Sequence, residues 1–113
     1  MRRSLTVTLS RVAATVTIAQ LTPAPTILTK AAVRQGTNER VTLTWTNVSY
    51  ETGYIVQWST NNFATVTGSS TLAANTTTFT SGTIARTTWY FRIRAFNATG
   101  SSNWVTVSVP AAP

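Results

Sequence analysis

The feature that most constrains this chain is an alternation of side chains at period two near its C-terminal end, in the stretch WYFRIRAFNATGSSNWVTVSV. The alternate residues that suit the buried side of a sheet are Trp89, Phe91, Ile93 and Ala95. Residues 97–103 are rich in Asn, Gly and Ser, which tolerate turn dihedrals, and the alternation then resumes in residues 105–109. The pattern predicts a strand, a loop and a return strand.

Other segments alternate in the same way. VTLTWT (residues 41–46) and YIVQW (residues 54–58) each place apolar or aromatic side chains on one face. Shorter strands are expected near residues 27–28, within residues 63–72 where Gly68 breaks the pattern, and at residues 76–80. Abundant Thr, Val and Ile favour strands over helices. We therefore expect an all-β fold, a two-sheet antiparallel sandwich of about seven strands.

The composition argues against catalysis. The chain has 113 residues, which is the size of one domain, and it contains no Cys, no His and no Asp. Its only acidic residues are Glu39 and Glu51, which are too far apart in sequence to form a local pair. Acid–base catalysis needs a group that titrates near neutrality, and the usual suppliers are missing. We predict that the chain is not an enzyme and uses no metal or cofactor.

The net charge of +7 favours an acidic partner. The charge is diffuse, because the eight Arg and one Lys never form a run longer than two. The sequence also lacks a glycine-rich phosphate loop, which makes nucleic acid a poor candidate. An acidic polymer remains an alternative partner.

Taken together and in order, the predicted strands resemble a fibronectin type III domain over about residues 21–113. The family's core Trp maps to Trp45, and its third-strand pattern maps to Gly53, Tyr54, Val56 and Trp58. Its later aromatic strand maps to Trp89, Phe91, Arg92, Ile93, Ala95 and Asn97. The resemblance implies an immunoglobulin-like sandwich.

The chain departs from the family pattern in three ways. Trp89 stands where the family has a Tyr whose hydroxyl ties a corner between strands, so we expect that hydrogen bond not to form in the same way. Ile84 lies one position closer to this residue than usual, which predicts a tightened loop over residues 84–88. Residues 97–103 lack the family's Arg-Gly-Asp tripeptide, so no integrin role carries over.

Residues 1–20 lie outside the resemblance and form an N-terminal extension that also reads as strands. SLTVTLS and ATVTIA alternate, and their apolar residues are Leu5, Val7, Leu9, Val16 and Ile18. A seven-stranded sandwich has no vacancy in its middle for these strands. They therefore extend an edge of their own sandwich or pair with a neighbouring chain, and disorder in solution is the third alternative.

A targeting role is the rival interpretation of the N-terminal extension. Met1, Arg2 and Arg3 give it the basic start of a secretory signal, but Arg11 and many Thr residues interrupt the apolar stretch that such a signal needs. No run of about twenty apolar residues occurs, which excludes a membrane-spanning helix.

The outward side of the strand at residues 89–97 is the candidate binding surface. Its residues are Tyr90, Arg92, Arg94 and Phe96, expected to lie beside Ile55 and Gln57. Aromatic and Arg side chains are typical of interface hot spots, and Trp104 at the end of the loop is expected to be exposed, whereas Trp58 is expected in the core. The alternative interpretation is a solvated face whose side chains cover one another.

These features favour a non-catalytic structural or interaction module that serves protein–protein assembly or adhesion. The expected setting is extracellular or surface-exposed, in a secreted protein or on a virion. Expected partners are copies of the chain itself or a larger assembly, such as a filament or a virion surface. The alternative function is a glycan- or polyanion-binding accessory module of a larger secreted protein.

Overall fold

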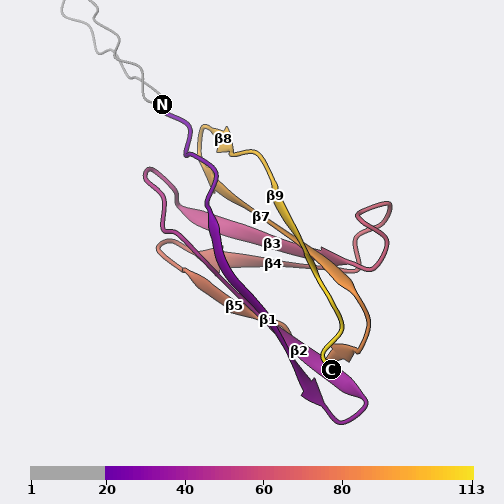
Figure 1. Cartoon of the computed structure of the whole chain (residues 1–113). Coiled ribbons are helices and arrows are strands. Elements are labelled where there is room, and N and C mark those ends of the chain that lie inside the picture. The colour runs from indigo at the N-terminus through magenta and orange to yellow at the C-terminus, as the bar shows by residue number, and fades with distance from the viewer. Residues whose placement is uncertain (1–19) are drawn as a thin grey trace, which may run out of the picture.

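The computed structural model describes residues 20–113, so the predicted strands with Leu5, Val7, Leu9, Val16 and Ile18 lie outside the described residues. The described part is built from strands alone (Figure 1). In chain order the strands are β1 (Ile27–Gln35), β2 (Asn38–Trp45), β3 (Gly53–Ser59), β4 (Gly68–Ala73), β5 (Thr78–Thr80), β6 (Ile84–Ala85), β7 (Trp89–Asn97), β8 (Gly100–Ser101) and β9 (Val105–Val109). Nothing within residues 20–113 is a helix that would be long and apolar enough to cross a membrane.

The strands form two antiparallel sheets. One sheet has the order β1-β2-β5, with β6 also paired to β2, and the other has the order β4-β3-β7-β8, with β9 also paired to β7. The all-β, two-sheet antiparallel sandwich predicted from the sequence is confirmed. Seven of the strands have three residues or more, and β6 and β8 are two-residue additions.

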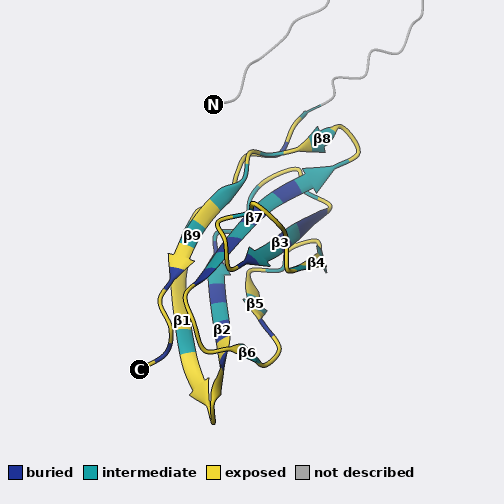
Figure 2. Cartoon of the chain, turned by 90° about the vertical axis from the view of Figure 1, so that its right-hand side faces the viewer, coloured by how far each residue is buried: buried dark blue, intermediate teal, exposed yellow. Residues whose placement is uncertain are grey.

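The core lies between the two sheets and is supplied mainly by β2, β3 and β7, which carry the dark bands in Figure 2. Along β2 and β7 every second residue is buried, as the alternation predicted. The fully buried large side chains include Trp45, Tyr54 and Phe91. Trp45 and Tyr54 are in contact at a tilt, with ring centroids 5.6 Å apart. Burial of this apolar surface is the main stabilising contribution to the fold.

The segment from Phe63 to Leu72, expected to hold one or two short strands, holds one. Gly68 begins this strand, β4, instead of interrupting it. The preceding residues form a turn around Ser59, whose hydroxyl oxygen accepts hydrogen bonds from the backbone N–H groups of Asn61 and Phe63, each at 3.1 Å. The sequence indicated a break at the glycine, but the turn chemistry before it is what sets the boundary.

The corner before β7 is closed by Trp89, but not in the way that a Tyr hydroxyl would close it. The indole N–H of Trp89 donates a hydrogen bond to the carbonyl oxygen of Ala85, at 2.8 Å. A Trp side chain has a donor of its own, and here it reaches the backbone four residues earlier. The corner between β6 and β7 is therefore tied by an indole rather than by a phenol.

The two ends of the described chain lie at opposite ends of the sandwich (Figure 1). Near β8, the side-chain amide of Asn97 donates hydrogen bonds to the carbonyl oxygens of Gln20, at 2.8 Å, and of Tyr50, at 2.9 Å. At the other end, the backbone N–H of Ala112 donates to a carboxylate oxygen of Glu39, at 2.9 Å. Side chains of β7 and β2 thus hold the two ends of the described part of the chain against the sandwich.

Candidate interaction surface

The outward face of the sheet that contains β3 and β7 carries the side chains singled out from the sequence. In the register of these strands, Arg94 lies opposite Ile55 and Arg92 lies opposite Gln57. On its other side Arg92 faces Thr106 of β9. The predicted neighbours are therefore confirmed, and they follow from the alternation of each strand together with the antiparallel register.

Arg92, Arg94, Trp104 and Phe63 form a stacked row that we call the Arg–aromatic ladder. The Arg92 guanidinium carbon lies 4.2 Å from the Phe63 ring centroid and 4.3 Å from that of Trp104. The Arg94 guanidinium lies 4.3 Å from the Trp104 ring centroid. These distances are within the range of cation–π attraction. The ladder therefore links the loop after β3, strand β7 and the residue before β9.

One hydrogen-bonding partner fixes the Arg92 side chain within this ladder. The Arg92 Nε and Nη2 atoms both donate to the Gln57 side-chain oxygen, at 3.0 Å and 2.7 Å. The fork geometry of a guanidinium makes this two-point contact natural for Arg and unavailable to Lys. Gln57 thereby holds the Arg92 plane in the orientation in which it stacks.

The ladder overturns one expectation about the tryptophans. Trp104 is half-buried rather than exposed, because it is covered by Arg92 and Arg94. Trp58 is also half-buried, and it packs against the core through contacts with Phe79 and Phe91, at centroid distances of 5.4 Å and 6.0 Å. The Trp104 ring is engaged within the chain, so the surface is better suited to stiffening β7 and β9 than to stacking a sugar ring.

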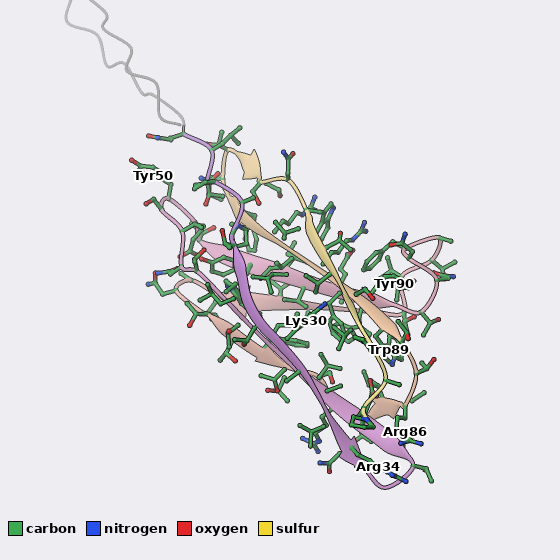
Figure 3. All side chains as sticks on the ribbon, in the orientation of Figure 1. Lys30, Arg34, Tyr50, Arg86, Trp89 and Tyr90 are labelled. Atoms are coloured by element: carbon green, nitrogen blue, oxygen red, sulfur yellow. The ribbon has the colours of Figure 1, made fainter. Side chains whose placement is uncertain are left out.

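Phe96 and Tyr90 stand apart from the ladder. Phe96 lies opposite Gly53, where a Cβ atom would come within 2.7 Å of the Phe96 ring. A cross-strand aromatic residue here covers a glycine. Tyr90 is paired with Ser59 and Ser108, beside the loop between β3 and β4 (Figure 3). Of the five predicted surface residues, the structure brings Arg92, Arg94 and Trp104 into contact.

The sequence did not predict the roles of two residues, Phe63 and Glu39. Phe63 lies in the loop between β3 and β4, and nothing in a loop sequence reveals which distant side chain it meets. Glu39 is fully buried on β2, with one carboxylate oxygen bound to Ala112 and the other without a hydrogen-bonding partner. The sequence does carry a signal for it, since Glu39 continues the inward alternation of Val41, Leu43 and Trp45.

One titratable group has a displaced pKa. Burial raises the pKa of the Tyr54 hydroxyl above its usual value, the hydrogen bond from the Val48 backbone N–H acts in the opposite direction, and the Glu51 carboxylate raises it further. The Tyr54 hydroxyl accepts from Val48, at 2.9 Å, and donates to Asn47, at 2.8 Å. This raised pKa keeps the phenol protonated, which suits a structural tie between β3 and the loop before it.

Acidic side chains are sparse in the described part of the chain, where Glu39 and Glu51 are the only ones. Within residues 20–113 no three His, Cys, Asp or Glu side chains gather as they would around a metal ion. The Arg–aromatic ladder consists of guanidinium and aromatic groups. This surface can therefore present the cationic edges of Arg92 and Arg94 on the strand pair β7 and β9.

Comparison with known proteins identifies the architecture. No protein-family model matches the chain, and no curated protein matches it either. Among solved structures, the chain is similar to FN3tt, with 18% identity, a TM-score of 0.64, and coverage of 81% of this chain and 96% of that one. A fibronectin type III domain of human collagen XX is 17% identical, with a TM-score of 0.57 and coverage of 86% and 100%.

A third similar structure is the fibronectin type III domain of human fibronectin type III domain containing protein 3. It is 17% identical, with a TM-score of 0.52 and coverage of 82% of this chain and 85% of that one. At such low identity the similarity concerns the backbone arrangement rather than any shared site. The resemblance read from the strand motifs and the observed two-sheet topology agree with these neighbours, and the chain therefore has the fibronectin type III fold.

Proposed function

We propose that this chain is a non-catalytic interaction module that mediates protein–protein assembly in an extracellular or surface-exposed structure, with its N-terminal strands pairing with a neighbouring copy. A filament or a virion surface would suit such a subunit. The fibronectin type III fold supports the coarser part of this proposal, because FN3tt and the collagen XX domain match this chain over nearly their whole length.

The observation that carries the proposal is the closed core of the described sandwich, together with the alternation of residues 1–19. The core cluster is supplied by residues from Val41 to Val109, and many of its members have no exposed surface. Residues 1–19 alternate as strands do. Segments of this kind are suited to pairing with an exposed sheet edge of another chain.

The rival function, binding of a glycan or another polyanion, draws on the net charge of +7. Its best candidate surface is the Arg–aromatic ladder. In that ladder the faces of Arg92 and Arg94 are stacked on Trp104, so much of their surface is engaged within the chain. Assembly is therefore the better-supported proposal.

Deletion of residues 1–19 tests the proposal. The shortened chain keeps Gln20, which Asn97 holds, and should still fold and unfold cooperatively. Sedimentation velocity should show the full chain assembled and the shortened chain monomeric at equal concentration. The proposal would be wrong if both chains sedimented as the same species.

A further inference from the structure

We infer that β4 is the edge to which the N-terminal strand of a neighbouring copy adds, specifically through the segment ATVTIA (residues 14–19). This inference rests on the proposed function, and it names the partner surface. In the described part of the chain the two sheets have edges at β1, β5, β9 and β4, and these edges differ in how open they are to another strand.

The edge at β1 has two features that oppose the addition of another strand. The register with β2 shifts between Ile27 and Thr29, which marks a bulge or irregularity at this end of the strand. Lys30 lies opposite the buried Leu43, on the inner side of the strand, and its side chain is exposed at this edge of the sandwich. Irregularities and inward-facing charges at an edge are recognised obstacles to adding a further strand.

Lys30 also opposes the addition of a strand at the edge of β9. The Lys30 ammonium group donates a hydrogen bond to the carbonyl oxygen of Ser108, which occupies a backbone acceptor of β9. Pro110 follows the strand directly and has no N–H to offer an added strand. The edge at β5 is three residues long, which is too short for a stable pairing.

Strand β4 has none of these obstacles. Its six residues, Gly68–Ala73, pair with β3 without any register shift and include no charge and no proline. The whole stretch between Glu51 and Arg86 lacks charged residues. Two copies that each carry a net charge of +7 repel one another, and this uncharged flank is where they can approach at the lowest electrostatic cost.

The side chains of β4 match those of the proposed donor. Leu72 and Ser70 lie opposite the buried Tyr54 and Val56, so they face inward, while Ser69 and Thr71 face outward and are exposed. In ATVTIA, Val16 and Ile18 alternate with threonines. An added strand would therefore continue an apolar inner side and a hydroxyl-bearing outer side, as register across a half-buried sheet requires.

The reach of the chain indicates that the donor comes from another copy. Asn97, at the end of β7, holds Gln20. A strand outside β4 lies three inter-strand spacings from β7, or about 14 Å. Ile18 is two Cα–Cα steps from Gln20, which span about 7 Å at full extension. Ile18 therefore cannot reach the β4 edge of its own chain, so ATVTIA as a whole cannot pair there.

Disulfide trapping tests this pairing in the full-length protein, which has no cysteine of its own. One preparation carries Thr17→Cys and a size tag. Three others carry Thr71→Cys or Ser69→Cys on β4, or Thr106→Cys on β9 as the matched control, because Thr106 is equally exposed. After mixing and mild oxidation, the tagged chain should couple to a β4 cysteine and not to Thr106→Cys. Coupling to Thr106→Cys, or to none of the three, would overturn the inference.

A second pair of variants measures the edge directly. Ser70→Lys places an inward-facing charge on β4, as Lys30 does on β1, whereas Thr106→Lys adds the same charge on β9. We expect Ser70→Lys to weaken self-association about tenfold or more and Thr106→Lys to leave it nearly unchanged. If Ser70→Lys assembles normally while deletion of residues 1–19 abolishes assembly, β4 is the wrong edge and the proposed function stands. If the deletion has no effect, the proposed function itself fails.

Discussion

Gly68 lies directly opposite Trp58 in the register of β3 and β4. A Cβ atom at this glycine would come within 2.3 Å of the Trp58 indole ring, and that ring is itself packed against Phe79 and Phe91. We predict that Gly68→Ala lowers the free energy of unfolding by about 1–3 kcal/mol, because the new Cβ atom would displace a ring that is packed against Phe79 and Phe91. Chemical denaturation measures the change.

Gly82→Ala is the matched control for Gly68→Ala. A Cβ atom at Gly82 meets nothing within 4 Å, and the backbone there is not in the left-handed region. We expect this substitution to be neutral or stabilising, by up to about 1 kcal/mol, since Ala restricts the unfolded chain. Equal losses in the two variants would contradict the steric explanation.

Glu39 supports a second prediction at the scale of single residues. Its buried carboxylate accepts the Ala112 backbone N–H, and Ala112 is itself buried. Glu39→Ala leaves that donor without a partner, which should cost about 1–3 kcal/mol of unfolding free energy. Glu39→Gln keeps an acceptor oxygen and should cost less. Equal unfolding midpoints for Glu39→Ala and the parent would show that the contact contributes nothing.

At the scale of strands, the Arg–aromatic ladder joins β7 to the residue before β9. A double-mutant cycle with Arg94→Ala and Trp104→Ala isolates their contact, because it removes the effects that each substitution has elsewhere. We expect a coupling free energy of about 0.5–1 kcal/mol, typical of a cation–π pair at a partly exposed site. Additive losses in the cycle would mean that the 4.3 Å stacking does not stabilise the fold.

The strands themselves were largely predictable. Those with clear alternation, β2, β3 and β7, were read from the sequence because backbone geometry alone sends successive side chains to opposite faces. Strand β4 was only partly read, since its boundary depends on a turn organised by Ser59 and on the Trp58 ring over Gly68. The Trp89 hydrogen bond was missed because it depends on where the chain folds back.

The strand that carries the candidate surface was predictable, but the contacts between its side chains and those of the loops were not. Alternation placed Arg92 and Arg94 on the outward face, and the structure agrees. The participation of Phe63 and the cover over Trp104 follow from loops that bring separated residues together, which no single segment encodes. For this reason the expectation of an exposed Trp104 was wrong.

For the whole molecule, the net charge of +7 sets opposite salt dependences for the two candidate functions. Raising salt from about 0.01 M to about 0.15 M shortens the Debye length from about 30 Å to about 8 Å. Repulsion between copies is then screened, so self-association through β4 should tighten. Binding to a polyanion such as heparin should weaken over the same range.

Sedimentation equilibrium at the two salt concentrations measures self-association, and retention on an immobilised polyanion measures the rival. Self-association that weakens with salt would indicate that attractive charges hold the copies together, contrary to pairing at an uncharged edge. Retention that persists at the higher salt concentration would indicate that the polyanion is bound mainly by contacts other than those with exposed charges.

The amino-acid sequence is enough to establish the all-β class, the inward residues of the main strands and the absence of Cys, His and Asp, because these depend on composition and on the local alternation of the backbone. The tertiary structure alone decided which residues meet across strands: Phe63 with Arg92, Trp58 with Gly68, and Glu39 with Ala112. It also placed Lys30 at the edges of β1 and β9, where it opposes the addition of another strand, whereas β4 carries no such residue. Register and loop closure bring these partners together, and both are properties of the folded whole.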